Sequence, residues 1–293
     1  MTSSATFEPI QASAAAAIAG YSIAPKEHMG IQIPQAEHRI NFVNFWKIAP
    51  GSRVLEIGCG QGDCTAVLAE AVGPTGHVDA VDPGRPDYGA PWTLAQAQAH
   101  LSASSIGDRI SWHFAEPTKF LADHAGENWD YVVFAHCIWY FESPTLLDNM
   151  LAALKGRATN LLIAEYALKA TEKDAVPHVL AAVARATLEA HNKASEANIR
   201  CLSSPAAIAD AAKDKGWTLG AETIIVPAEG LLDGSWEVGP VKSKGFLEEV
   251  EEHIEDLRVK ALLHSARDAV IGVMESQGVT KARTMDVWIA KFN

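Results

Sequence analysis

Short apolar runs rich in β-branched residues alternate with helical patterns along most of this chain. The runs expected to form strands cover residues 53–57, 77–81, 109–114, 130–135, 160–164, 222–226 and 284–290. Between them, apolar residues recur at helical spacing, and glycine or proline residues mark the breaks. A crossover helix between two strands lets them lie parallel. The alternation therefore predicts an α/β fold around a mostly parallel sheet.

The first run leads into a turn with three glycines at alternate positions. Gly58, Gly60 and Gly62 lie in the segment EIGCGQG, which starts at Glu56. Glycine tolerates positive φ angles and lets the backbone approach a ligand closely, because it has no Cβ. A dinucleotide-binding turn reads G-x-G-x-x-G and receives a pyrophosphate, whereas here the third glycine comes one position early and a carboxylate precedes the first. The pattern favours a ligand with a cationic amino-acid portion over NAD.

A second acid, Asp82, follows the second run. A carboxylate at this strand tip can accept hydrogen bonds from both hydroxyls of a ribose. Together with the run at residues 130–135, the glycine turn and Asp82 resemble the class I S-adenosylmethionine (SAM)-dependent methyltransferases. The resemblance covers residues 54–164, with weaker support from the last two runs.

The resemblance implies a Rossmann-like, seven-stranded, mostly parallel sheet with helices on both faces, to which this chain adds a helical lid. It also implies an enzyme that uses SAM to methylate an O or N atom of a small-molecule metabolite. The turn would contact the methionine part of SAM, Asp82 the ribose and Glu116 the adenine amino group. The implied cofactor contacts are Tyr21, Glu56, Gly58, Cys59, Gly60, Gly62, Asp82, Pro83, Ala115, Glu116, Ala135 and His136. Unlike many members of the family, the chain carries an extra loop at residues 85–91.

The acceptor side of the site is expected after the fourth and fifth strands, because ligands collect at the carboxyl ends of parallel strands. His136 is the candidate catalytic base, since imidazole titrates at about pH 6.5 and can take a proton from a hydroxyl. The alternative is that His136 binds or packs against the cofactor. The candidate substrate contacts are Trp139, Tyr140, Glu165 and Tyr166, although aromatic residues at this spacing can equally form a helix core.

Residues 1–50 are predicted to form an N-terminal helical cap, with a helix around residues 35–46. Tyr21, His28, Met29 and His38 could fold over the site, and Tyr21 could close on the carboxylate of SAM. The SAM-binding domain then spans residues 51–293.

Helical insertions into this domain are expected at about residues 167–217 and 228–280. Within the second, residues 246–274 read as one amphipathic face that includes Phe246, Val250, Ile254, Leu257 and Ala261. This face would serve as a lid over the site or as the contact surface of a homodimer. The alternative is an extra helix that packs against the domain and has no role at the site.

The net charge and the cysteine pattern indicate which ligands and partners the chain is not expected to bind. A net charge of -12 without a cluster of Lys or Arg disfavours nucleic acid. Cys59, Cys64, Cys137 and Cys201 have neither paired spacing nor histidine partners, so neither disulfides nor a metal site is expected. No apolar stretch reaches the roughly 18 residues of a membrane span, and no signal peptide is evident, so a cytoplasmic protein without membrane partners is expected.

Two other functions stay open at this point. A SAM-binding enzyme of this fold could use the sulfonium charge to drive an elimination or cyclisation, in which case it would release no S-adenosylhomocysteine. A methyltransferase-like regulatory binding protein would keep its role after SAM binding is lost.

Overall fold

The sheet is seven-stranded in the computed structural model, which describes residues 6–24, 26–192 and 197–293. In chain order the strands are β1 (Arg53–Ile57), β2 (His77–Asp82), β3 (Ile110–Phe114), β4 (Trp129–Ala135), β5 (Ala158–Tyr166), β6 (Leu219–Ile225) and β7 (Val287–Phe292). Their spatial order is β3-β2-β1-β4-β5-β7-β6. The strands β1 to β5 run parallel, and β7 is antiparallel to both β5 and β6. The predicted mostly parallel, Rossmann-like sheet is confirmed.

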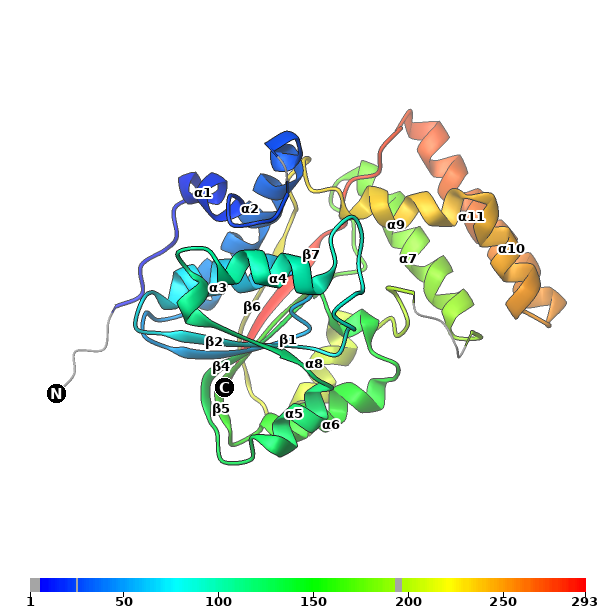
Figure 1. Ribbon diagram of the computed structural model, residues 1–293. Helices are drawn as coiled ribbons and strands as arrows, with labels where there is room; N and C mark the ends of the chain where they lie inside the picture. The colour runs from blue at the N-terminus through cyan, green and yellow to red at the C-terminus, as the bar shows by residue number, and fades with distance from the viewer. Residues whose placement is uncertain (1–5, 25, 193–196) are drawn as a thin grey trace.

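Helices cover both faces of the sheet (Figure 1). One face carries α1 (Ala15–Ala19), α2 (Met29–Trp46), α3 (Asp63–Val72) and α4 (Leu94–Ser102). The other carries α5 (Pro117–Asp123), α6 (Pro144–Leu154) and α8 (Pro205–Asp214). Each face buries its own apolar cluster, as expected for a sheet that is covered on both sides.

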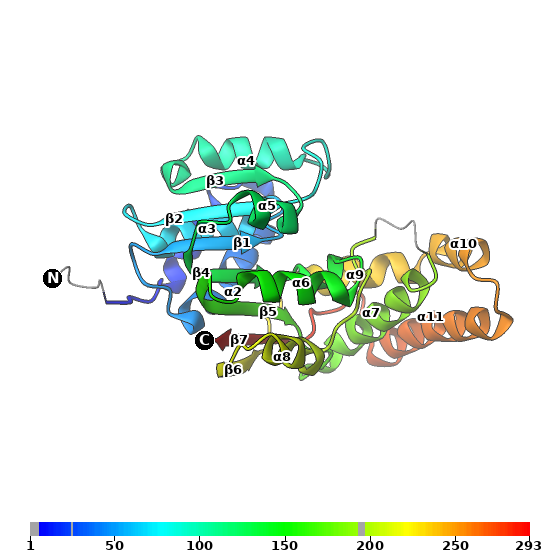
Figure 2. The same cartoon turned by 90° about the horizontal axis from the view of Figure 1, so that it is seen from below.

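The remaining helices gather beyond one end of the sheet (Figure 2). They are α7 (Val176–Glu189), α9 (Asp233–Lys242), α10 (Lys244–His253) and α11 (Leu257–Gln277). Their apolar faces form a separate core around Leu188, Val238, Phe246 and Val270. Both predicted insertions thus contribute helices to one body, which we call the helical insertion. No helix in the described part of the chain is long and apolar enough to cross a membrane.

Local signals place several helix ends as expected. Ser204 caps α8 by accepting the amide N–H of Ala207 at 3.2 Å, and Pro205 occupies the first turn. Thr93 and Gln96 form a capping box at the start of α4.

The expectation of one continuous amphipathic face over residues 246–274 is wrong. The chain breaks between α10 and α11, where Asp256 caps α11 by accepting the amide N–H of Arg258 at 2.7 Å. Phe246, Val250 and Ile254 are buried as expected. Leu257, which is 78% exposed, and Ala261, which is also exposed, lie beyond the break.

Other boundaries also differ from the expected ones. The helix expected at residues 35–46 begins at Met29, and α5 has no counterpart among the expected elements. The last strand begins at Val287 instead of residue 284. The carboxylate of Asp286 instead accepts hydrogen bonds from the amide and hydroxyl of Thr171, at 3.0 and 2.7 Å.

Candidate functional site

The three glycines of the turn after β1 all have positive φ angles, of 74°, 54° and 98° for Gly58, Gly60 and Gly62. A Cβ on Gly58 would lie 2.5 Å from the Cβ of Cys137, and one on Gly62 would lie 2.5 Å from Cδ1 of Leu101. A Cβ on Gly60 would meet no described atom within 4 Å. Gly58 and Gly62 therefore serve internal packing, and Gly60 offers the open backbone that a ligand can approach.

Asp82 connects the tip of β2 to this turn. Its Oδ2 accepts the amide N–H of Gly60 and its Oδ1 that of Gly84, both at 2.8 Å. The side chain of Gln98 on α4 donates to the carbonyl of Gly60 at 2.8 Å. Each carboxylate oxygen has a second lone pair, so Asp82 can still accept ligand hydroxyls in the predicted ribose-binding position.

Glu56 lies beneath the turn and is 1% exposed. The Thr65 hydroxyl on α3 donates to Glu56 Oε2 at 2.5 Å. Burial raises the pKa of Glu56 to about 7, against the opposing effect of the Thr65 hydrogen bond. Cys59 is also buried, and burial raises the pKa of its thiol. Both side chains support the turn from inside, so their direct contact with SAM stays a prediction.

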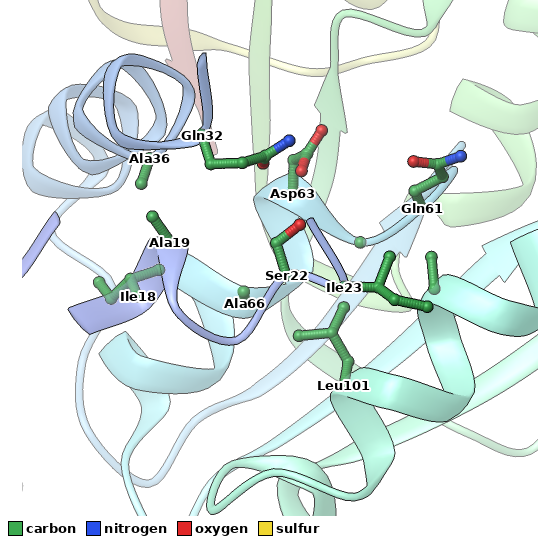
Figure 3. Close-up of a pocket in the computed structure, with 12 residues that line it drawn as sticks. Ile18, Ala19, Ser22, Ile23, Gln32, Ala36, Gln61, Asp63, Ala66 and Leu101 are labelled. Atoms are coloured by element: carbon green, nitrogen blue, oxygen red, sulfur yellow. The ribbon is translucent and has the colours of Figure 1, made fainter. Parts of the chain in front are cut away.

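The N-terminal segment packs over the other side of the turn and leaves a narrow cavity (Figure 3). Ser22 and Ile23, Gln32 of α2, Gln61 of the turn and Leu101 of α4 are among the residues that line it. The cavity measures about 20 Å³, which is room for about one water molecule. A larger ligand on this side requires the N-terminal segment to move outward.

Tyr21 fastens this segment to α3. Its hydroxyl donates to Oε1 of Glu70 at 2.8 Å and is 3.3 Å from the hydroxyl of Ser105. The Tyr21 hydroxyl is therefore bonded to Glu70, away from the glycine turn. These contacts do not support the expected contact between Tyr21 and the SAM carboxylate.

The expected adenine side lies beyond Asp82. Pro83 and Glu116 are exposed, and Ala115 donates its amide N–H to the carbonyl of Asp82 at 3.0 Å. Nearby, Trp92 Nε1 and Gln98 Oε1 are buried without a hydrogen-bond partner in the described part of the chain. These two atoms were not predicted as contacts, and they offer one donor and one acceptor to a ligand.

The turn and the end of β4 meet where the strand order reverses between β1 and β4. Ile57 pairs with Phe134, which brings the glycine turn beside Ala135 and His136. Such a reversal opens a crevice at the carboxyl ends of the strands. The structure thus brings the expected methionine site and the candidate base to the same point of the sheet.

His136 is held between a carboxylate and a second histidine. Its Nδ1 lies 3.5 Å from Glu165 Oε1, and its Nε2 lies 3.2 Å from Nε2 of His38 on α2. The His38 and His136 rings are stacked, with centroids 5.4 Å apart and an interplanar angle of 19°. Burial lowers the pKa of His38 well below its ordinary value, and the neighbouring His136 and Arg39 lower it further. His38 is therefore a neutral imidazole near pH 7.

Glu165 and Tyr166 extend this arrangement along β5. The wholly buried carboxylate of Glu165 accepts the amide N–H groups of Ile138 and Tyr166, at 3.1 and 3.0 Å. The Tyr166 hydroxyl donates to Oδ2 of Asp233 at 2.9 Å, and burial raises its pKa well above the ordinary range. Gln35 of α2 donates to Oδ1 of the same Asp233 at 2.8 Å.

Trp139 and Tyr140 have different surroundings. Trp139 is 2% exposed, and its indole N–H donates to the carbonyl of Ser203 at 2.9 Å. Its ring packs against Tyr166, so it supports that side chain from behind. Tyr140 is 46% exposed and can meet an acceptor.

Sequence reasoning missed three polar residues here: Gln35, His178 and Asp233. His178 accepts the amide N–H of Met285 through Nδ1 at 3.0 Å, its Nε2 has no partner among the described residues, and burial lowers its pKa to about 4. None of the three lies near a motif, and only the packing of α2, α7 and α9 brings them to the site. In the described ranges, no three His, Cys, Asp or Glu side chains are arranged to hold a metal ion.

Comparison with known proteins agrees with this geometry. The family model of a methyltransferase domain matches residues 31–221. Methyltransferase phomM' of Diaporthe leptostromiformis is 30% identical over 282 residues, which cover 81% of this chain and 72% of that protein. A second methyltransferase of that organism, phomM, is 28% identical over 288 residues, with the same coverage.

A solved structure is similar over nearly the whole fold. It is a cyclopropane-fatty-acyl-phospholipid synthase-like protein from Lactobacillus casei, with a TM-score of 0.82 and 31% identity. The match covers 97% of this chain and 100% of that one. With the family model matching well over half of the chain, this protein belongs to the class I SAM-dependent methyltransferases and is an enzyme.

Proposed function

We propose that this enzyme transfers the methyl group of SAM to an O or N atom of a small-molecule metabolite. One observation carries the proposal: the open backbone at Gly60 and the pair His136 and His38 lie at the same strand-order reversal, between β1 and β4. A methyl donor bound at the turn would then lie beside a proton acceptor. When bound, SAM supplies an electrophilic methyl group on a sulfonium.

The residues around the turn fit SAM. Gly60 leaves room for close backbone approach, and Asp82 has spare lone pairs for ribose hydroxyls. The unpartnered Gln98 Oε1 and Trp92 Nε1 belong to residues that contact the turn, since Gln98 donates to the carbonyl of Gly60 and Trp92 accepts from the side chain of Gln61. The catalytic contribution of such a site is mainly to position the donor and acceptor atoms for in-line displacement.

The acceptor side favours a small molecule. Asp233 of α9 accepts hydrogen bonds from Gln35 of α2 and from Tyr166 of β5. These hydrogen bonds hold the helical insertion against the sheet next to His136. The net charge of -12 also opposes the approach of a nucleic-acid backbone. Buried imidazole and carboxylate groups suit an acceptor that loses a proton as it is methylated.

The cofactor part of the proposal is tested by calorimetric titration with SAM and S-adenosylhomocysteine. Asp82→Ala is expected to weaken SAM binding by about 1 to 3 kcal/mol, because ligand hydroxyls lose a charged partner. Asp87→Ala, in the exposed loop after Asp82, is the matched control. Equal affinities of the Asp82 variant and the native enzyme would remove Asp82 from the site.

The acceptor is sought with methyl-labelled SAM and a panel of amines, phenols, carboxylates and an unsaturated phospholipid. The last compound belongs to the class named in the structural relative. Label on O or N together with S-adenosylhomocysteine supports the proposal. Label on a lipid carbon, or product formed without S-adenosylhomocysteine, contradicts it.

A further inference from the structure

The contact between the two buried histidines limits which nitrogen can exchange a proton with an acceptor. The Nε2 atoms of His38 and His136 face each other at 3.2 Å. Two bare nitrogens would repel through their lone pairs, and two N–H groups would repel through their protons. One of the two nitrogens therefore donates and the other accepts.

Glu165 determines the direction of this hydrogen bond. Its carboxylate lies 3.5 Å from Nδ1 of His136, so the N–H of His136 is best placed on Nδ1. Nε2 of His136 is then bare and accepts the Nε2–H of His38. At 3.5 Å this is a charge–dipole contact and not a hydrogen bond.

Nε2 of His136 is engaged with His38, and Nδ1 of His136 is buried without a hydrogen-bond partner in the described part of the chain. Phe42 lies edge-on to His38 at 4.4 Å between ring centroids, and Tyr166 covers the His136 ring at 4.4 Å. His136 also has a φ angle of 53°, uncommon for a residue other than glycine, and its amide N–H is bonded to the carbonyl of Ala164 at 2.8 Å. The backbone and the rings thus hold His136 in place with its Nδ1 buried on the side of Glu165. Nδ1 of His38 is the one ring nitrogen of the pair that lies neither in the contact between the histidines nor among the buried unpartnered atoms.

We propose that His38 of the N-terminal cap is the catalytic base, and that His136 and Glu165 are positioning residues that orient it. This inference rests on the proposed methyl transfer to O or N. The acceptor proton passes to Nδ1 of His38, and the electron pair of the broken O–H or N–H bond stays on the acceptor atom. That atom bonds the methyl carbon as the carbon–sulfur bond breaks, and the electrons of that bond remain on sulfur. The charge taken up by His38 is then shared through Nε2 with His136, next to the carboxylate of Glu165.

Several other ionisable groups lie against the pair or, in the case of Asp233, against Tyr166 and His178 beside it. From α2 comes Arg39, from β5 Glu165 and Tyr166, from α7 His178 and from α9 Asp233. The lowered pKa of His38 leaves its imidazole unprotonated at neutral pH and also makes it a weaker base than a free imidazole.

The first test requires no acceptor. Nitrogen-15 NMR of the imidazoles at pH 7 is expected to show protons on Nε2 of His38 and on Nδ1 of His136. Protonated Nδ1 at His38 would overturn the proposal, whatever the acceptor proves to be. Failure of SAM binding or of methyl transfer, in contrast, would overturn the proposed function and leave this tautomer result unchanged.

The second test uses the acceptor found with labelled SAM. His38→Gln keeps a donor near His136 but has no basic nitrogen, so kcat is expected to fall by about 100-fold or more while the Kd for SAM is unchanged. The loss should shrink at high pH, where the acceptor ionises by itself. His100→Gln, at an exposed position of α4, is the matched control.

Chemical rescue separates a base from a structural residue. In His38→Ala, added imidazole is expected to restore part of the activity, because it can enter the space that the side chain vacates. A loss of kcat that is equal at every pH and unaffected by imidazole would assign His38 a structural role and overturn the proposal.

Discussion

Gly58, Gly60 and Gly62 look equivalent in the sequence but differ in their surroundings. Gly60→Ala is expected to cost about 1 to 2 kcal/mol of stability, the cost of a left-handed Ala, and to weaken SAM binding because its methyl group enters the open space. Gly62→Ala should mainly destabilise the fold, because its Cβ would overlap Leu101. Chemical denaturation combined with calorimetric SAM titration distinguishes the two effects. Normal SAM affinity in a folded Gly60→Ala enzyme would contradict the assignment of this open side to the ligand.

The buried carboxyl of Glu56 gives a pH-dependent prediction. Because its pKa is raised to about 7 in the folded enzyme, folding favours the protonated form. The stabilisation is complete below the ordinary pKa of about 4.5 and is lost as the pH rises through about 7.

Glu56→Gln imitates the protonated side chain. Its free energy of unfolding should equal that of the native enzyme near pH 4.5 and exceed it by about 3 kcal/mol above pH 7, according to the linkage between pKa and stability. Urea denaturation at the two pH values measures this difference. Glu248→Gln, at an exposed position of α10, controls for the loss of a charge, and a gap that does not grow with pH would refute the buried-acid account.

Asp233 makes two of the polar contacts between the helical insertion and the sheet domain. Asp233, in the first turn of α9, accepts hydrogen bonds from Gln35 and Tyr166 and is 8% exposed. Its position at a helix N-terminus also favours a negative charge. Asp233 therefore fastens α9 to both α2 and β5, on the acceptor side of the site.

Asp233→Ala leaves the Tyr166 hydroxyl and the Gln35 amide without their acceptor. We expect a loss of about 3 kcal/mol in unfolding free energy, the scale of unsatisfied buried polar groups, and faster hydrogen exchange in α9. Asp268→Ala, at an exposed position of α11, is the control. Unchanged exchange in α9 would show that Asp233 is not needed to hold α9 against the sheet domain.

At the scale of the whole molecule, the chain carries a net negative charge. Its fold matches that of the Lactobacillus casei relative along 97% of the chain. At a net charge of -12, retention on heparin at about 0.15 M salt is not expected, because the protein would bring few cations to release from a polyanion. Elution from a heparin column measures this directly. Salt-dependent retention would reveal a local basic groove and reopen nucleic acid as a substrate. The possible homodimer stays a prediction.

The succession of strands along the chain and the glycine turn could be predicted from the sequence because they depend on neighbouring residues. The Ser204–Pro205 helix start and the alternate glycines are local signals, and each is found where it was expected. Apolar periodicity located most of the elements but not all of their ends, since α2 begins at Met29 and β7 at Val287. The break at Asp256 is local too, but the continuing helical periodicity concealed it.

The chemistry of the acceptor side was decided by tertiary structure. His38 and His136 are 98 positions apart, and Gln35 and Asp233 are 198 apart. No local pattern reports such contacts, because they depend on how α2 and α9 pack against the sheet. The burial that raises the pKa of Glu56 and lowers that of His38 also comes from this packing. The sequence by itself therefore determined the fold and the position of the glycine turn. The three-dimensional packing decided which side chains act together.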